Sequence, residues 1–157
     1  MGNTPQTTPA QKLQAERLTY PGLLPREIIV LRNWLKLHES EYDRFDYNVR
    51  LGDGFDPGPT FEPNIRDMAI QNTQKRVDAV GYKGSTATLI EVKDRAGFSA
   101  IGQIVGYDAL WRKANPAAPE PKLLLVCNRF APDILPVLER QGIEINVVAA
   151  DFSELKG

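Results

Sequence analysis

The sequence contains almost no cysteine or histidine. Its 157 residues include one cysteine, Cys127, and one histidine, His38. A single cysteine excludes a disulfide within the chain and any zinc or iron–sulfur cluster built from several cysteines, and a single histidine excludes a histidine-rich metal site. Cys127 lies in an apolar run, so we expect it to be a small buried side chain. Any polar chemistry must therefore come mainly from carboxylates, amines, guanidinium groups and amides.

The chain also lacks a strong net charge and a long apolar run. Its 19 Lys/Arg and 20 Asp/Glu give a net charge of −1, so the chain as a whole is not a basic nucleic-acid-binding protein. It has no apolar stretch of about 18 residues and no signal peptide, and we expect a soluble cytoplasmic protein without membrane contact. A length of 157 residues is enough for one domain with a sizeable core.

The most informative stretch is a predicted β-hairpin over residues 76–93. Residues 76–82 alternate apolar and polar side chains, 83–85 form a turn, and 86–92 are rich in β-branched and aliphatic residues. Side chains alternate along a strand, which places Glu91 and Lys93 on the same face. Asp78 on the first strand lies beside Glu91 if the register allows, and two carboxylates and an ammonium group then converge.

This grouping suits phosphodiester chemistry. Two close carboxylates form a hard-oxygen site for Mg²⁺ or Mn²⁺. Such a cation polarises a phosphodiester and makes a bound water more acidic, and a nearby lysine can orient that water. Without a metal, the carboxylates of Asp78 and Glu91 would repel each other and the phosphate. The residues therefore predict a metal site at the end of the hairpin.

Asp78 followed by Glu91-Val92-Lys93 resembles the motif of the PD-(D/E)xK nuclease superfamily. Ten residues later, Gln103 and Tyr107 resemble the QxxxY helix motif of its RecB-type exonuclease branch. One position departs from the pattern, because Val77 rather than proline precedes Asp78. The resemblance covers roughly residues 25–148 in element order, but individual residues match only between 76 and 107.

The resemblance implies a Mg²⁺-dependent (or Mn²⁺-dependent) deoxyribonuclease with DNA as its partner. The implied catalytic residues are Asp78, Glu91, Lys93 and Gln103, and the implied metal ligands are Asp78, Glu91 and the backbone carbonyl of Val92. In many members of the superfamily a glutamate on the first helix also reaches the metal. Glu27 occupies such a position, although a first-turn acid favoured by the helix dipole is the more ordinary interpretation.

Substrate contacts are predicted from local charge and from Tyr107. Residues 75–113 carry seven Lys/Arg and four Asp/Glu, a local net charge of +3. A mixed solvated surface explains this equally well. The predicted substrate-binding residues are Tyr107, Arg76, Arg95 and Lys113. Tyr107 could stack on a base or bind a phosphate, and Gln103 could bind a phosphate or the attacking water.

The remaining periodicities predict an α/β protein with a restriction-endonuclease-like αβββαβ core, in which helices flank a mixed central sheet. Helices are expected over residues 25–40, 100–113 and 131–141, and further strands over 45–51, 122–127 and 143–148. Residues 1–24 are predicted to be a flexible N-terminal arm, 25–150 the nuclease-like domain, and 151–157 a C-terminal tail.

Two further expectations concern glycine. Glycine and proline punctuate residues 52–63, so we expect no regular structure there, and 65–69 could form a helical turn or a strand. A connection of this length would contact substrate or a second subunit. Within the helix over 100–113, Gly102, Gly106 and Ala109 form a smooth stripe, which we expect to pack closely on the sheet.

Two other functions remain open. The first is a non-catalytic binding or structural protein on the same fold, serving as a component of a larger assembly such as a viral one. The second is a homodimeric, structure-specific endonuclease rather than an exonuclease or end-processing enzyme. Metal binding and mass in solution distinguish these alternatives.

Overall fold

The computed structural model describes residues 14–17 and 19–155, which form a five-stranded mixed sheet with helices on both faces. The strands are β1 (Arg44–Leu51), β2 (Lys75–Lys83), β3 (Thr86–Ala96), β4 (Lys122–Phe130) and β5 (Ile143–Val147). They lie in sequence order across the sheet. The pairs β1–β2 and β2–β3 are antiparallel, and β3–β4 and β4–β5 are parallel. The predicted fold class is confirmed.

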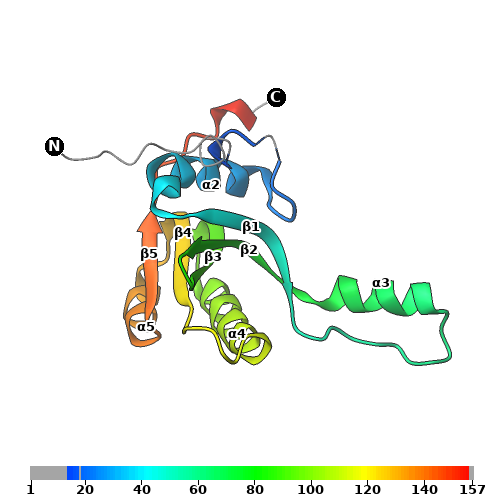
Figure 1. Ribbon diagram of the computed structural model, residues 1–157. Coiled ribbons are helices and arrows are strands. Elements are labelled where there is room, and N and C mark those ends of the chain that lie inside the picture. Colours follow the sequence, from blue (N-terminus) through cyan, green and yellow to red (C-terminus); the bar gives the residue numbers. More distant parts are fainter. Residues whose placement is uncertain (1–13, 18, 156–157) are drawn as a thin grey trace.

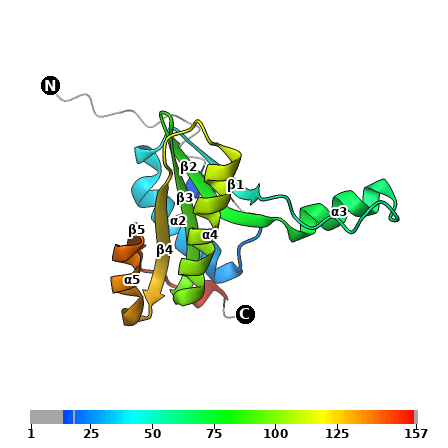
Figure 2. The same cartoon turned by 90° about the horizontal axis from the view of Figure 1, so that it is seen from below.

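The helices divide the structure into three layers (Figures 1 and 2). They are α2 (Pro25–His38), α3 (Pro63–Thr73), α4 (Phe98–Ala114) and α5 (Leu135–Arg140), with short 3₁₀ turns η1 (Glu39–Glu41), η2 (Pro132–Ile134) and η3 (Ser153–Leu155). Helix α2 covers one face of the sheet, and α4 and α5 cover the other. None of the helices in the described part of the chain is both long and apolar enough to cross a membrane.

Each face of the sheet has its own core. On the α2 side, Trp34 and Leu35 pack with Ile90 and Val92 of β3. On the α4 side, Ile104 packs with β4, including Cys127, which is fully buried and free as predicted. Alternate side chains of β3 therefore face different helices, and this alternation separates Glu91 and Lys93 from the α2 core.

Helix α4 is rotated relative to the expectation. Gly102, Gly106 and Ala109 are exposed, and nothing lies within 4 Å of a Cβ placed on either glycine. The buried stripe is Ile101, Ile104, Tyr107 and Trp111. Large apolar side chains remove more surface from water than glycine does, so they take the sheet-facing side. The prediction that the glycines pack on the sheet was wrong.

Residues 52–74 form an arm that projects from the sheet (Figures 1 and 2). No regular element occurs over 52–62, as expected, but the expected short turn or strand over 65–69 is instead part of α3, an 11-residue helix with no buried side chain. The Arg66 guanidinium forms an ion pair with Asp56 at 2.6 Å, and Thr73 Oγ1 accepts a hydrogen bond from the Phe55 amide at 2.6 Å. These contacts tie the two limbs of the arm together.

Parts of both predicted terminal segments pack on the domain. Ala15 and Tyr20 are buried in the α2-side core, and Phe152 packs against that core. The remainder of the predicted arm, residues 1–13, lies outside the described residues, as do residue 18 and the last two residues of the predicted tail.

Candidate active site

The candidate site lies where β2 and β3 separate. Their pairing runs from Lys83↔Thr86 to Ala79↔Ile90, and the next pair in this register would be Asp78 opposite Glu91. At this point the backbone pairing between β2 and β3 stops. The Val92 amide donates instead to the side chain of Asp78, whose Oδ2 accepts this hydrogen bond at 2.8 Å. We call this opening between β2 and β3 the fork. The sequence places Asp78 beside Glu91 only if the register allows it, and the observed register brings the two residues together.

Glu91 is the most buried member of the site. Its side chain is 2% exposed, and its Oε1 lies 3.2 Å from Nζ of Lys93, which is 26% exposed. Oε2 is also buried and makes no hydrogen bond of regular geometry with the described residues, although the carboxyl of Asp78 and the hydroxyl of Tyr107 lie beside this carboxylate. Burial raises the pKa of Glu91, although the ammonium group of Lys93 opposes this. An acceptor oxygen without a donor is costly in a protein interior and is suited to receive a cation.

Asp78 shares this environment. Burial and then the neighbouring charge of Glu91 raise the pKa of Asp78 to about 8, while the hydrogen bond from the Val92 amide acts in the opposite direction. The charge of Glu27 also raises the pKa of Asp78, so the first turn of α2 faces the fork. Glu27 Oε1 accepts a hydrogen bond from the Leu24 amide at 3.0 Å, so this residue also stabilises the helix start.

Helix α4 supplies the other polar groups. The pKa of Tyr107 is raised by burial and then by the charges of Glu91 and Asp78, so its hydroxyl lies beside the carboxylate pair. Gln103, one turn earlier, makes a polar contact with the same hydroxyl. Both residues line a groove of about 640 Å³ whose other lining residues are Lys75, Ser99, Gly102, Gly106, Ala109 and Leu110. The exposed glycines leave this groove open next to the fork.

The predicted cationic contacts are distributed unevenly. Arg76 lies two residues before Asp78, and its Nη2 donates to the Gln71 carbonyl at 3.5 Å. Arg95 is exposed and lies two residues after Lys93. Lys113 is ten residues beyond Gln103, about 15 Å along the helix axis, and lies 3.8 Å from Asp53. Arg76 and Arg95 therefore flank the fork, whereas Lys113 lies at the far end of α4.

A divalent cation fits the donors at the fork. In a strand, the N–H and C=O of one residue point towards the same neighbour, so the Val92 carbonyl points to the same side as its amide, towards Asp78. The described residues contain no cluster of three or more His, Cys, Asp or Glu side chains arranged to hold a metal. Two carboxylates and one carbonyl, completed by water, match the preference of Mg²⁺, which keeps several waters when bound.

Sequence reasoning missed two features near the fork. Asn48 is opposite Asp78 in β1, between the pairs Tyr47↔Ala79 and Val49↔Val77, and has a φ of 53°. Asparagine tolerates this left-handed conformation better than most residues, but the regular alternation of 45–51 concealed it. The second feature is an ionic cluster around Asp94, the residue after Lys93. Its other members come from distant segments, and no local signal indicates them.

No protein-family model matches this sequence, and none of the curated proteins does so either. One solved structure with a similar arrangement is described as an EndoMS–dsDNA2 complex. The two chains are 14% identical with a TM-score of 0.47, and the alignment covers 86% of this chain and 50% of the other. The present chain thus spans about half the length of that neighbour. A similarity this low does not assign a function.

Proposed function

We propose that this protein is a metal-dependent nuclease that hydrolyses phosphodiester bonds in DNA. The observation that carries the proposal is the environment of Glu91. This carboxylate is almost fully buried, one oxygen contacts the ammonium group of Lys93, and the other makes no hydrogen bond of regular geometry although the acid Asp78 lies beside it. Perturbed carboxylates of this kind are costly in a fold and are typical of functional sites.

The positions of the motif residues add support. Asp78 and the Glu91-Val92-Lys93 segment, which resemble the PD-(D/E)xK motif, lie on adjacent strands and meet at the fork. Gln103 and Tyr107 lie on the following helix and face the same carboxylates. The residues that carry the sequence resemblance therefore converge in space. A chance match spread over 30 residues would not be expected to do so.

Asp78, Glu91 and the carbonyl of Val92 would hold the cation. When bound, it supplies positive charge to the phosphate and makes water more acidic. Lys93 donates one N–H to Glu91, and its remaining donors can orient the attacking water. The water oxygen attacks phosphorus, a P–O bond breaks, and the leaving oxygen receives a proton. Gln103 is placed to hold a phosphate oxygen next to this centre. Tyr107 is only 6% exposed, so the expectation that its ring stacks on a base was wrong, and its role would be confined to the hydroxyl beside the carboxylates.

A cleavage assay tests this proposal. Linear double-stranded, single-stranded and closed circular DNA should be incubated with Mg²⁺, Mn²⁺ or EDTA. We expect metal-dependent cleavage that is lost in Glu91→Ala and Lys93→Ala by at least 100-fold. Lys83→Ala is the matched control, because Lys83 is an exposed lysine at the hairpin turn. Full cleavage by either site variant, with its circular dichroism unchanged, would refute the mechanism. The preferred DNA would separate exonuclease from endonuclease action.

A second candidate is a non-catalytic component of a larger assembly. The arm over residues 52–74 favours this second function, because α3 buries no side chain. Isolated helices of 11 residues are marginally stable in water, so a partner that packs on α3 would stabilise it. Exposed apolar residues along the arm include Phe55, Phe61 and Met68. Calorimetry with Mg²⁺ or Mn²⁺ distinguishes the two functions, since a purely structural component should show no binding that depends on Asp78. A solution mass near twice 17.5 kDa would identify a second copy as the partner.

A further inference from the structure

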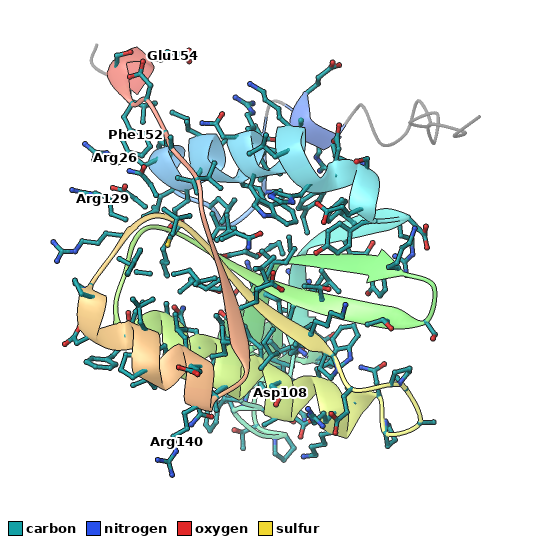
Figure 3. The ribbon with its side chains drawn as sticks, turned by 90° about the vertical axis from the view of Figure 1, so that its left-hand side faces the viewer. Arg26, Asp108, Arg129, Arg140, Phe152 and Glu154 are labelled. Carbon is teal, nitrogen blue, oxygen red and sulfur yellow. The ribbon has the colours of Figure 1, made fainter. Side chains whose placement is uncertain are left out.

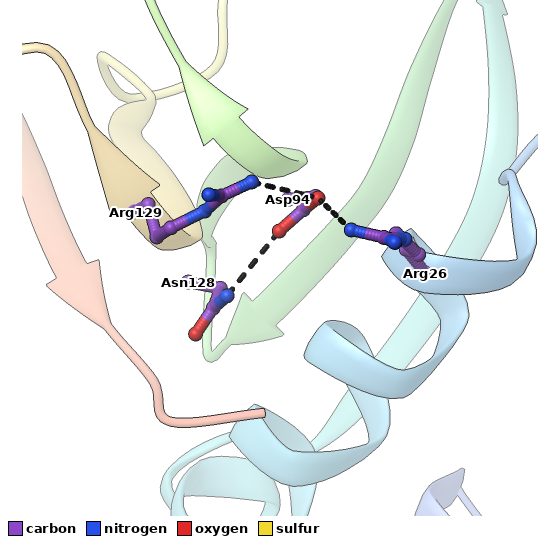
Figure 4. Close-up of polar contacts among 4 residues, drawn as sticks. All are labelled: Arg26, Asp94, Asn128 and Arg129. Atoms are coloured by element: carbon purple, nitrogen blue, oxygen red, sulfur yellow. Dashed lines mark hydrogen bonds and ion pairs between the residues drawn. The ribbon is translucent and has the colours of Figure 1, made fainter. Parts of the chain in front are cut away.

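Two arginines converge on a single carboxylate oxygen next to the fork (Figure 4). Asp94 Oδ2 accepts from Arg26 Nη1 at 3.2 Å and from Arg129 Nη2 at 3.4 Å. The other oxygen, Oδ1, accepts from Asn128 Nδ2 at 3.2 Å. The four residues come from the first turn of α2, from β3 and from β4, so folding assembles a cluster that no single segment contains.

The cluster carries more positive charge than its own acid neutralises. The carboxylate of Asp94 forms ion pairs with the guanidinium groups of both Arg26 and Arg129, at 3.2 and 3.4 Å. One negative charge then faces two guanidinium groups. Each guanidinium has five N–H donors and gives Asp94 only one in the structure. The side chains of Arg26 and Arg129 are 54% and 58% exposed, so their other donors remain accessible.

The arginines are also held in place. The guanidinium carbon of Arg26 lies 4.8 Å from the ring centroid of Phe152, in the C-terminal segment. Figure 3 shows Arg26, Arg129 and Phe152 together at one end of the molecule, whereas Arg140 lies well away from them. A guanidinium held between an aromatic ring and a carboxylate loses less freedom when it binds an anion.

The cluster is adjacent to the candidate active site. Asp94 directly follows Lys93 and, because strand side chains alternate, projects from the α2 face while Lys93 projects from the α4 face. Arg26 directly precedes Glu27, whose charge acts on Asp78. The cluster and the carboxylate pair therefore lie on either side of β3 at the same end of the strand.

We propose that Arg26 and Arg129 bind a phosphate of the DNA strand next to the one being cut, and that Asp94 positions them. This inference rests on the proposed function. The ligand chemistry is that of a phosphate group, which two arginines can bind through several parallel N–H donors. The phosphate could belong to the continuous backbone or to a strand end. In either case Asp94 is a positioning residue, because it acts through the arginines.

We call Arg26 and Arg129, as held by Asp94, the phosphate clamp. Measuring DNA binding in EDTA tests the clamp without cleavage. Fluorescence anisotropy with a labelled oligonucleotide should be measured across a salt series for the wild type and for Arg26→Gln/Arg129→Gln. We expect roughly tenfold weaker binding at low salt and a salt slope smaller by about 0.7 to 0.9, the value for one lost phosphate contact. Arg26→Lys/Arg129→Lys keeps the charges and should recover most of the slope. Arg140→Gln is the control, because it removes an exposed arginine away from the cluster.

The structural alternative is an ion-pair network that only ties α2 to the sheet. In that case the glutamine double variant would lower the melting temperature but leave the affinity and salt slope of the folded protein unchanged. That result would overturn the clamp. Comparing 5′-phosphorylated, 3′-phosphorylated and unphosphorylated oligonucleotides identifies the source of the phosphate. A preference for one phosphorylated end, lost in the variant, indicates a terminal phosphate, whereas equal losses on all three indicate a backbone phosphate.

The clamp and the proposed function can fail separately. Metal-dependent cleavage with unaltered binding in the arginine variants overturns the clamp and leaves the nuclease standing. Binding that depends on Arg26 and Arg129, without cleavage under any metal, supports the clamp and refutes catalysis. A wild-type protein that binds no DNA in EDTA or in Ca²⁺ overturns both.

Discussion

Replacing Asp78 with asparagine should make the metal-free protein more stable at neutral pH. The folded state raises the pKa of Asp78 from 3.8 to about 8, so the fold favours the protonated carboxyl. A raised pKa contributes stability below the unfolded value, and this contribution is lost as the pH rises towards the folded value. Asparagine cannot ionise, its Oδ1 can still accept from the Val92 amide, and its amide can donate to the unpaired oxygen of Glu91.

The size of the effect follows from the shift. Each pKa unit corresponds to about 1.4 kcal/mol, so between pH 4 and pH 7 the wild type should lose on the order of 4 kcal/mol relative to Asp78→Asn. Asp78 and Glu91 interact, so the two carboxyl groups share this loss. Saturating Mg²⁺ should reverse the loss in the wild type, since a ligand that binds only the folded state stabilises it.

Urea unfolding followed by circular dichroism at pH 4, 5.5, 7 and 8 would measure this difference. The control is Asp67→Asn, which removes an exposed carboxylate on the arm. We expect its free energy of unfolding to follow that of the wild type at every pH. If Asp78→Asn also follows the wild type, or is less stable at pH 8, then the carboxylates are not strained in the folded protein. The inference that the carboxylates at the fork form a cation-binding site would then be refuted.

Two predictions concern other parts of the chain. Gly102→Ala and Gly106→Ala should each stabilise the protein by about 0.5 to 1 kcal/mol, because both positions are exposed helix interior and a Cβ meets nothing within 4 Å; a lower melting temperature would mean that α4 packs as the sequence first suggested. Leu51 and Lys75 are partners in the β1–β2 ladder, so an Asn-Gly turn can replace residues 52–74. Because α3 buries no side chain, removing the arm should leave the melting temperature nearly unchanged. Because the arm carries one arginine and four acids, its removal should leave DNA affinity unchanged or higher. Weaker binding would show that the arm contacts DNA.

The sequence predicted the strands best where alternation and turn chemistry agreed. The hairpin is such a case: Gly84, with a φ of 57°, lies at the turn, and the two strands extend on both sides as expected. The sequence left the pairing of Asp78 with Glu91 dependent on the register, and the turn at Gly84 determines that register in the folded hairpin. Helix α3 was harder to predict, since it begins at the third of three closely spaced prolines and lacks the apolar stripe that a core would impose.

Helix α4 shows a different limit. Its sequence contains two possible contact faces, one smooth and one built from Ile101, Ile104 and two aromatic residues. Periodicity alone fits both, because both recur every three or four residues. The choice depends on the space above the sheet, which the larger side chains fill. The Asp94 cluster illustrates the same point, since two of its members come from segments about 70 and 35 residues away and only the folded sheet brings them together.

The two sides of β3 carry opposite imbalances of charge. On the α4 side, two buried carboxyl groups, Asp78 and Glu91, have only the ammonium group of Lys93 to stabilise their ionised forms. On the α2 side, Arg26 and Arg129 exceed the single charge of Asp94. Neither imbalance stabilises the chain alone, because like charges in proximity repel. A nucleic-acid strand with a divalent cation would offset both charge imbalances, because the cation would bind the carboxylates and a neighbouring phosphate would bind the arginines. This arrangement is expected of a surface that holds a nucleic-acid strand across the fork.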